Sequence, residues 1–322
     1  MHKLKLWVFC FLIISPVSAS PVSASVQKKQ LWVYTSIYKE FAAPIKQAFE
    51  KQYPNIEVNI FQAGSEKIQT KIEAELLAKK TQADIVLVSD PFWPSTLSKR
   101  GLLHSRTKHP TIETNYYSLM IIVCHKDMPV QQRPKSFIDF TKPEFKKLIQ
   151  FGSPLESGTM FVTIAYLSQK YGWEYFEKLR DNQLASQGGN STVIQKIESG
   201  EKKIGIVLLE NALAALKRGS PIDIVYPTDG GIPIPSVQVI LKDSPSKEEA
   251  SVFADFLLSK EGQMYLRNGF MYSVNKDVPP PEGAKNMSLA TNLKNLWTED
   301  FVQKISLHGQ DIKKKFSKLI LE

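Results

Sequence analysis

The sequence predicts an α/β fold of two lobes, and three observations support this prediction. The chain has 322 residues, which is too long for one ordinary domain. In its first third, apolar runs typical of strands alternate with segments of helical periodicity, as in a parallel sheet with right-handed crossovers. Two further apolar runs, at residues 116–125 and 232–241, are candidates for strands that cross from one lobe to the other and back.

The N-terminal segment is set apart from this fold. A positively charged start precedes an apolar run at residues 6–14, and small residues follow at 17–19. This pattern is typical of a cleaved secretory signal peptide and is too short for a membrane anchor. A duplicated Pro-Val-Ser-Ala-Ser leaves the cleavage site open between Ala19 and Ala24, so residues 1–25 are assigned to the signal peptide. We therefore expect an exported, periplasmic protein.

Composition excludes several classes of function. Lys and Arg outnumber Asp and Glu by 41 to 32, which gives a formal charge of +9. The surplus is spread along the chain without a basic stripe interleaved with aromatics, so nucleic-acid binding is not expected. A basic balance does fit the steering of an anionic ligand. Once Cys10 is removed with the leader, Cys124 is the only cysteine, so no internal disulfide is expected.

The first lobe is expected to begin with three strands, each followed by a helix. The strands are predicted at residues 31–36, 56–62 and 84–89. Because parallel strands end at the same edge of a sheet, ligands in such folds bind beyond those ends. The residues at the three ends are Thr35-Ser36, Ser65 and Asp90.

The second half of the chain is organised around residues 185–210. Gly188 and Gly189 favour a turn, and Thr192 followed by Gln195 has the capping-box pattern of a helix start. Residues 204–209 then predict a strand buried on both faces. Other expected elements are strands at 149–153 and 222–226, helices at 156–167 and 211–218, capping boxes at Thr141 with Glu144 and at Ser246 with Glu249, and, from about residue 279, helices laid over the first lobe.

Hydroxyl-bearing residues recur where strands end and helices begin. Such positions offer a side-chain O–H together with free backbone N–H groups at the positive end of a helix dipole. If several converge on one cleft, they can bind a phosphate, phosphonate or carboxylate without a counter-charge. Ordinary N-capping is the simpler explanation of each position when it is taken alone. The candidates are Thr35, Ser36, Ser65, Ser157, Gly158, Thr159, Asn190, Ser191 and Thr192.

Two acids and two aromatics allow two interpretations each. Glu210 follows the buried strand and either accepts from ligand hydroxyls or an ammonium, or only balances a helix dipole. Asp90 either contacts ligand or makes the Asp-Pro turn. Phe92 and Trp93 either stack on an apolar part of the ligand or pack in the core.

Metal and hydrolytic chemistry are less well supported. The histidines show no ligand spacing and no acidic cluster suggests calcium, so no cofactor or metal is expected. Tyr116 and Tyr117 could ligate ferric iron, although aromatics are also ordinary in an apolar strand. A secreted hydrolase could act through Ser157, but no G-x-S-x-G elbow is present.

Several segments together resemble the extracellular solute-binding proteins of ABC importers. They are YTSIYKEFAAPIKQAFEKQYPNIEV, QAGSEKIQTKIEAEL, ADIVLVSDP, GNSTVIQKIESGEKKIGI and FADFLLSKEGQMYL. The resemblance is to the branch that includes ferric-ion, phosphonate and hexose-phosphate receptors. It implies a two-lobed type II periplasmic-binding-protein fold with the ligand in the interlobe cleft. It also implies that residues 26–120 form the first part of lobe 1, residues 121–235 form lobe 2, and residues 236–322 return to lobe 1 with the C-terminal helices.

The resemblance also narrows the expected ligand. Where ferric receptors carry a tyrosine pair, this chain has Glu210-Asn211-Ala212. The hydroxyl positions instead match the phosphate-holding residues of receptors for phosphorylated ligands. We therefore expect a monomeric receptor, not an enzyme, that delivers a phosphorylated or phosphonate solute such as a hexose phosphate to an inner-membrane ABC permease. The alternatives are a ferric-iron receptor and a secreted serine hydrolase.

Overall fold

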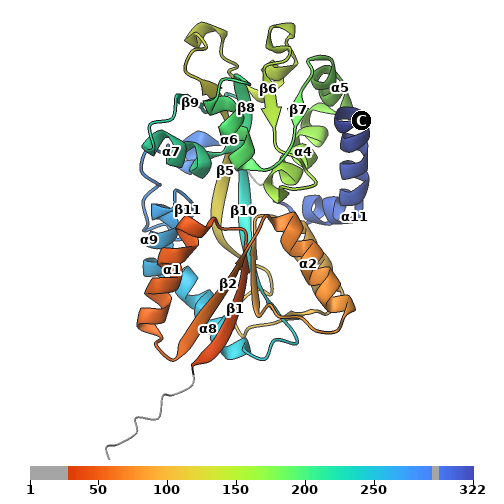
Figure 1. The fold of residues 1–322 in the computed structure, drawn as a ribbon. Coiled ribbons are helices and arrows are strands. Elements are labelled where there is room, and N and C mark those ends of the chain that lie inside the picture. The colour runs from red at the N-terminus through yellow and green to blue at the C-terminus, as the bar shows by residue number, and fades with distance from the viewer. Residues whose placement is uncertain (1–27, 292–296) are drawn as a thin grey trace, which may run out of the picture.

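A computed structural model describes residues 28–291 and 297–322 (Figure 1). The expected signal peptide, with its cleavage positions Ala19 and Ala24, lies outside the described residues. Within them, no helix combines the length and the apolar character needed to cross a membrane.

One sheet runs through the whole molecule. Its strands, in chain order, are β1 (Lys29–Thr35), β2 (Ile56–Gln62), β3 (Ile85–Val88), β4 (Leu103–His104), β5 (Glu113–His125), β6 (Ile149–Phe151), β7 (Ala185–Ser186), β8 (Ile204–Leu208), β9 (Ile222–Val225), β10 (Ile232–Leu241) and β11 (Tyr272–Ser273). Neighbouring strands follow the order β2-β1-β3-β10-β5-β8-β6-β7, while β4 pairs with β10 and both β9 and β11 pair with β5. The long antiparallel strands β5 and β10 pass through the middle of the molecule and join its two halves (Figure 1).

Helices cover both halves of this sheet. They are α1 (Lys39–Gln52), α2 (Ser65–Leu77), α3 (Phe92–Lys99), α4 (Gly158–Tyr171), α5 (Trp173–Asp181), α6 (Asn190–Glu198), α7 (Leu209–Lys217), α8 (Lys247–Leu258), α9 (Lys260–Asn268), α10 (Met287–Ala290) and α11 (Glu299–Phe316), with short turns η1 (Val130–Gln132), η2 (Phe137–Thr141), η3 (Pro143–Phe145) and η4 (Ser317–Leu321). We call the half with β1–β4, α1–α3, α8 and α9 the first lobe. The half with β6–β9 and α4–α7 is the second lobe (Figure 1).

Parallel pairing, which the sequence predicted for the first lobe, is present in both lobes. In the first lobe β1 pairs in parallel with β2 and β3, so these strands end at the same edge. In the second lobe β6 pairs in parallel with β7 and β8. The helices that follow these strands therefore begin at the edges of the two half-sheets that face each other across the middle of the molecule (Figure 1).

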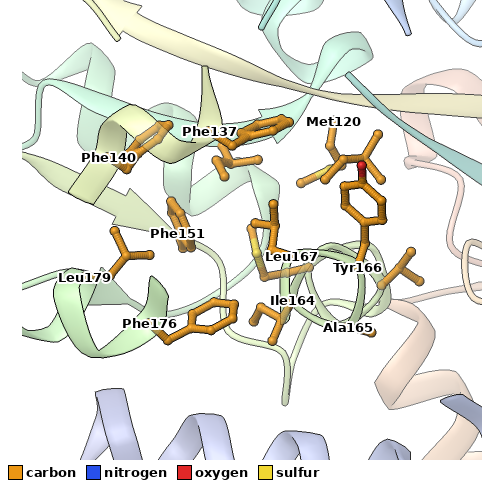
Figure 2. Packing of buried hydrophobic residues seen from close by; sticks show 14 of the residues in the cluster. Met120, Phe137, Phe140, Phe151, Ile164, Ala165, Tyr166, Leu167, Phe176 and Leu179 are labelled. Atoms are coloured by element: carbon orange, nitrogen blue, oxygen red, sulfur yellow. The ribbon is translucent and has the colours of Figure 1, made fainter. Parts of the chain in front are cut away.

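Each lobe has its own hydrophobic core. In the first lobe Phe49 packs edge-on against Phe253 and Phe256 from α8, at ring-centroid distances of 4.9 and 5.5 Å. The second-lobe core is rich in phenylalanine, and Figure 2 shows Phe140 and Phe151 packing beside α4. Since these side chains are almost fully buried, they hold α4 and the strands of the second lobe in fixed positions.

The C-terminal helix differs from the expectation that it would lie over the first lobe. α11 contacts α3 of the first lobe, but it also packs on α4, and Phe301 and Ile305 belong to the second-lobe core. Its last residue, Phe316, meets Phe176 at a ring-centroid distance of 5.6 Å. The apolar face of α11 is therefore buried against both lobes.

Three predicted capping boxes are not formed. α6 begins at Asn190 with Gly189 at the N-cap, so Thr192 lies inside the helix. Thr141 ends η2, and Lys142 precedes η3. Ser246 does occupy the N-cap of α8, but its hydroxyl donates to the Gln30 carbonyl instead. In each case a tertiary contact or an adjoining turn overrides the local pattern.

Candidate functional site

A cavity of about 220 Å³ lies between the lobes, where several helices begin. The first lobe contributes the segment before α1 and the start of α2. The second lobe contributes the starts of α4, α6 and α7. The residues that line the cavity are Ser36, Ile37, Tyr38, Phe41, Gln62, Gly64, Ser65, Lys67, Ser89, Tyr116, Glu156, Ser157, Gly158, Thr159, Gly189, Asn190, Ser191, Leu208, Glu210 and Met271.

On the first-lobe side, hydroxyl groups form a connected set around Ser89. The backbone N–H of Ser89 donates to Ser65 Oγ at 3.2 Å. The Ser89 hydroxyl lies 3.4 Å from Ser36 Oγ and 3.5 Å from the Tyr116 hydroxyl. Because these residues come from the ends of β1 and β3, the start of α2 and the crossing strand β5, the fold itself brings their hydroxyls together.

On the second-lobe side, a second set is centred on Thr159. Ser157 is the N-cap of α4, where its hydroxyl accepts from the Met160 N–H at 3.3 Å. The same hydroxyl lies 3.0 Å from Thr159 Oγ1, which also accepts from the Asn190 side-chain amide at 3.0 Å. Asn190 in turn accepts from the Leu208 N–H at 3.2 Å. These bonds fix the start of α4 relative to the start of α6 and the end of β8.

The two lobes touch at the rim of the cavity through glycines. A Cβ placed on Gly158 would lie 2.8 Å from the Cβ of Ser65, and one on Gly64 would lie 2.8 Å from the Glu156 carbonyl oxygen. Real Cβ atoms do not approach other atoms this closely, so glycine is needed at both places. The structure is therefore a closed form in which the lobes are in contact.

One buried acid faces the cavity. Glu210 lies in the first turn of α7 and is 4 % exposed. Its Oε1 accepts from the Ser118 hydroxyl at 2.5 Å, while Oε2 has no hydrogen-bond partner among the described residues. Burial raises the pKa of Glu210 to about 7, although the Ser118 hydrogen bond acts in the opposite direction. This carboxyl can therefore take up or release a proton near neutral pH.

Of the two adjacent tyrosines that the sequence offered as iron ligands, only Tyr116 reaches the cavity. Tyr116 lines the cavity, whereas Tyr117 lines a different hollow beside Trp297. Burial raises the pKa of Tyr116 to about 12, so its phenol stays protonated. Burial also raises the pKa of Tyr38, and the nearby Ser191 side chain acts against that shift. In the described part of the chain, His, Cys, Asp and Glu side chains form no group of three that could hold a metal.

Most of the residues that the sequence singled out come together here. Those that line the cavity are Ser36, Ser65, Ser157, Gly158, Thr159, Asn190, Ser191 and Glu210. Thr35, Asp90 and Thr192 do not line it. Thr35 accepts from the Ile37 N–H, Asp90 accepts from the Phe92 N–H, and Thr192 packs on Gly188.

Aromatic side chains after β3 belong to the core instead. Phe92 lies among Phe161, Trp297 and Phe301. The Trp93 indole N–H donates to Glu73. This agrees with the packing interpretation of Phe92 and Trp93.

Sequence reasoning missed several lining residues. Ser89 could have been found, because it stands at the end of a predicted strand beside Asp90. Tyr38 precedes α1 and Glu156 precedes Ser157, so their positions next to helix starts were also available as signals. Lys67 and Gln62 lack such a signal, since exposed polar residues of this kind are common on any surface.

Comparisons with known proteins agree with this architecture. The family model for bacterial extracellular solute-binding proteins matches residues 31–271. The structure of the periplasmic binding protein AfuA from Actinobacillus pleuropneumoniae, with exogenous fructose-6-phosphate bound, is similar with a TM-score of 0.80 and 23% identity. That match covers 91% of this chain and 99% of AfuA. Iron-bound HitA from Pseudomonas aeruginosa is similar with a TM-score of 0.77 and 18% identity, over 89% of this chain and 99% of HitA.

A relative is also found by sequence. It is the "putative 2-aminoethylphosphonate-binding periplasmic protein" of Salmonella typhimurium, 23% identical over 232 residues, which are 66% of this chain and 69% of the relative. The solved structures establish the two-lobed α/β fold, and the family match extends over both lobes. The chain therefore belongs to the bacterial extracellular solute-binding protein family, and it is a solute-binding protein and not an enzyme.

Proposed function

We propose that this protein captures a small phosphorylated or phosphonate solute and delivers it, as a monomer, to an ABC permease in the inner membrane. The observation that carries the proposal is the convergence of hydroxyls and helix starts from both lobes on one cavity. The AfuA structure holds fructose-6-phosphate, and the Salmonella relative is named for 2-aminoethylphosphonate, which supports the same class of ligand.

The helix starts supply the donors that an anion needs. Gly158 and Thr159 are the first two residues of α4, and Asn190 and Ser191 are the first two of α6. Backbone N–H groups in a first helical turn have no acceptor within their own helix. They point outward at the positive end of the helix dipole, where a phosphoryl oxygen is a favourable acceptor. Each charge-assisted bond of this kind contributes about 1.5–3 kcal/mol.

Thr159 is positioned to donate its hydroxyl proton. Its oxygen already accepts from the Asn190 amide, and the neighbouring Ser157 hydroxyl can donate to it as well. With both lone pairs used in this way, the Thr159 proton is free to point at a ligand. Asn190 thereby orients the hydroxyl as well as linking α4 to α6.

Glu210 suits the other end of the solute. Its unpartnered Oε2 can accept from an ammonium or from a sugar hydroxyl. Both 2-aminoethylphosphonate and a hexose phosphate combine an anionic group with such a donor. A second anionic group at this end would meet a buried carboxylate and be repelled.

Iron is the weaker alternative for this site. The tyrosines proposed for iron are separated, since Tyr117 lies outside the cavity and Tyr116 is a protonated phenol hydrogen-bonded to Ser89. Position 210 carries a carboxyl that is itself half protonated near pH 7. An anion held by neutral donors accounts for more of the lining residues than a ferric ion does.

Binding is expected to proceed by closure about β5 and β10. The ligand contacts hydroxyls on both lobes, so it interacts with the closed form more strongly than with the open form. This difference is what shifts the population towards closure. The open form offers the same groups to solvent on two separated faces.

Calorimetry tests the proposal. The protein is unfolded and refolded to remove bound solute, then titrated with fructose 6-phosphate, 2-aminoethylphosphonate and ferric citrate. Saturable binding of a phosphorylated or phosphonate compound, weakened in Thr159→Val, is the expected result. Binding of ferric citrate alone, or a copurifying solute that mass spectrometry identifies as lacking phosphorus, contradicts it.

A further inference from the structure

Outside the cavity, one buried lysine of α11 contacts both α2 and α4, two helices whose first residues line the cavity. Lys313 of α11 is 6 % exposed. Its ammonium lies 2.5 Å from Glu66 Oε2, and Glu66 is the second residue of α2, directly after Ser65. The same ammonium lies 4.4 Å from the centre of the Phe161 ring on α4. Figure 1 shows α11 lying beside α4, with its lower end near the start of α2.

The two contacts of Lys313 belong to different lobes. α2 is part of the first lobe and α4 is part of the second, and the ligand cavity lies between their N-terminal ends. When the lobes separate, Ser65 moves away from Gly158, and Glu66 and Phe161 move apart with them. If α11 moves with the first lobe, Lys313 loses its contact with Phe161. If α11 moves with the second lobe, Lys313 loses its contact with Glu66.

The charge balance at this place depends on Lys313. Glu66 is buried, its Oε1 has no hydrogen-bond partner within the described ranges, and Lys313 binds its Oε2. Asp90 is buried close by, with its Cβ 3.3 Å from the position that a Gly158 Cβ would occupy. The charge of Glu66 helps burial to raise the pKa of Asp90, and Lys313 acts in the opposite direction. Lys313 is thus the counter-ion of Glu66, and its charge also acts on the nearby Asp90.

We propose that Lys313 is a positioning residue for ligand binding. It contacts the starts of α2 and α4 at the same time and so stabilises the closed form. In the closed form its ammonium compensates the buried Glu66 carboxylate. In the open form water hydrates that carboxylate, and Lys313 is not required. The contacts of Lys313 with Glu66 and Phe161 lie outside the cavity and touch no ligand, so Lys313 affects closure alone. This role depends on the closed structure and not on the chemical identity of the solute.

The effect of removing the ammonium follows from this asymmetry. Lys313→Met leaves Glu66 buried without a partner only when the lobes are closed, so it shifts the population towards the open form. Glu66→Gln in the same chain removes the uncompensated charge, so the double variant recovers much of the closed population. Lys314→Met is the matched control, because Lys314 is an exposed neighbour on the same helix.

Closure is measured with spin labels on the two lobes. Cysteines introduced by Lys80→Cys and Glu144→Cys lie at exposed positions of the first and second lobes, and the native Cys124 is buried and does not compete. Distance distributions are recorded by pulsed electron resonance for each variant, without ligand and with fructose 6-phosphate or 2-aminoethylphosphonate. We expect the closed distance to lose weight in Lys313→Met, to recover in the double variant, and to be unchanged in Lys314→Met. Affinity for a probe that binds should fall roughly tenfold or more in Lys313→Met, as expected for a charge left buried without its partner.

Two outcomes separate this inference from the proposed function. If wild type binds neither probe, the proposed function fails, while the ligand-free distributions still decide the role of Lys313. If Lys313→Met lowers the melting temperature but leaves every distance distribution and affinity equal to wild type, the lysine only stabilises the fold and its proposed role in closure is wrong.

Discussion

Ser65 and Gly158 lie on opposite lobes and are in such close contact that a Cβ on Gly158 would come within 2.8 Å of the Ser65 Cβ. The contact joins the starts of α2 and α4, the two helices whose first residues line the cavity. It exists only when the lobes are closed. Any side chain at position 158 therefore raises the free energy of the closed form and leaves that of the open form unchanged.

Gly158→Ala should weaken ligand binding without destabilising the ligand-free protein. The added methyl group holds the lobes apart by a fraction of an ångström, so the ligand loses contacts on one side. Overpacking of this kind costs about 1–3 kcal/mol, and we expect the binding free energy to become less favourable by that amount. The melting temperature of the ligand-free protein should stay within about a degree or two of wild type. Isothermal titration calorimetry and thermal unfolding measure the two quantities.

A compensating variant tests the cause. In Ser65→Gly the opposing Cβ is absent, so adding Gly158→Ala should cost little further affinity beyond the loss of the Ser65 hydroxyl. A full additional loss in the double variant would show that the alanine acts on the ligand directly and not through the contact with Ser65.

Thr159→Val should reduce affinity by about 1–3 kcal/mol while the fold survives. The change removes the hydroxyl proton that faces the cavity, and it also deprives the Asn190 amide of its acceptor. Thr159→Ser keeps the hydroxyl and should retain most of the affinity. Thr163→Val is the control, because that hydroxyl donates to the Thr159 carbonyl within the helix and does not line the cavity. Equal affinities in Thr159→Val and wild type would reduce Thr159 to a structural residue.

Periodicity and turn residues predicted the fold well, for reasons that the structure makes clear. The strand at 56–62 and the strand at 232–241 have the predicted bounds, because apolar runs flanked by turns leave little choice of register. Gly219 ends α7 with a positive φ of 84°, a conformation that glycine adopts without strain. Local chemistry alone decided these features.

Features that depend on tertiary contacts could not be predicted in this way. Thr192 looked like a helix cap, but the Asn190 side chain binds Thr159 and Leu208, and the helix begins at Asn190. The surface on which α11 packs depends on where the two lobes expose apolar side chains. The periodicity of α11 itself does not reveal this. Asp90 stands in line with Ser36 and Ser65 at the strand ends, yet its side chain turns back to the Phe92 N–H.

The chemical class of the solute can be read from the pH dependence of binding. An ammonium needs Glu210 in its ionised form, and burial raises the pKa of that carboxyl to about 7. Affinity for 2-aminoethylphosphonate should therefore fall as pH is lowered from 8 to 6, and Glu210→Gln should lower it strongly at pH 8. A sugar hydroxyl can still donate to the glutamine carbonyl, so affinity for fructose 6-phosphate should change less. Calorimetry of both compounds over this pH range distinguishes the two solutes, and a flat profile for the amine would contradict contact with Glu210.

Glu210→Gln should also stabilise the closed form that the structure shows, at neutral and alkaline pH. The pKa of Glu210 is about 7 in the folded state, against an ordinary value of 4.5. Between these values the folded state holds a proton that the unfolded state has lost, so the free energy of unfolding decreases as pH rises through this range. The difference of 2.5 pKa units amounts to about 3 kcal/mol above pH 7, and it vanishes below about pH 4.5, where both states are protonated.

Denaturant unfolding at a series of pH values checks this prediction. Relative to wild type, Glu210→Gln should gain stability progressively from pH 5 to pH 7 and then show a constant advantage. Glu177→Gln, at an exposed position of α5, is the control and should follow the wild-type curve. If the Glu210→Gln and wild-type curves run parallel over the whole range, the carboxyl titrates at its ordinary pH, and its burial carries no cost in the ligand-free protein. In that case the cavity would have to be open to water in solution, since only hydration of Glu210 Oε2 could remove the penalty.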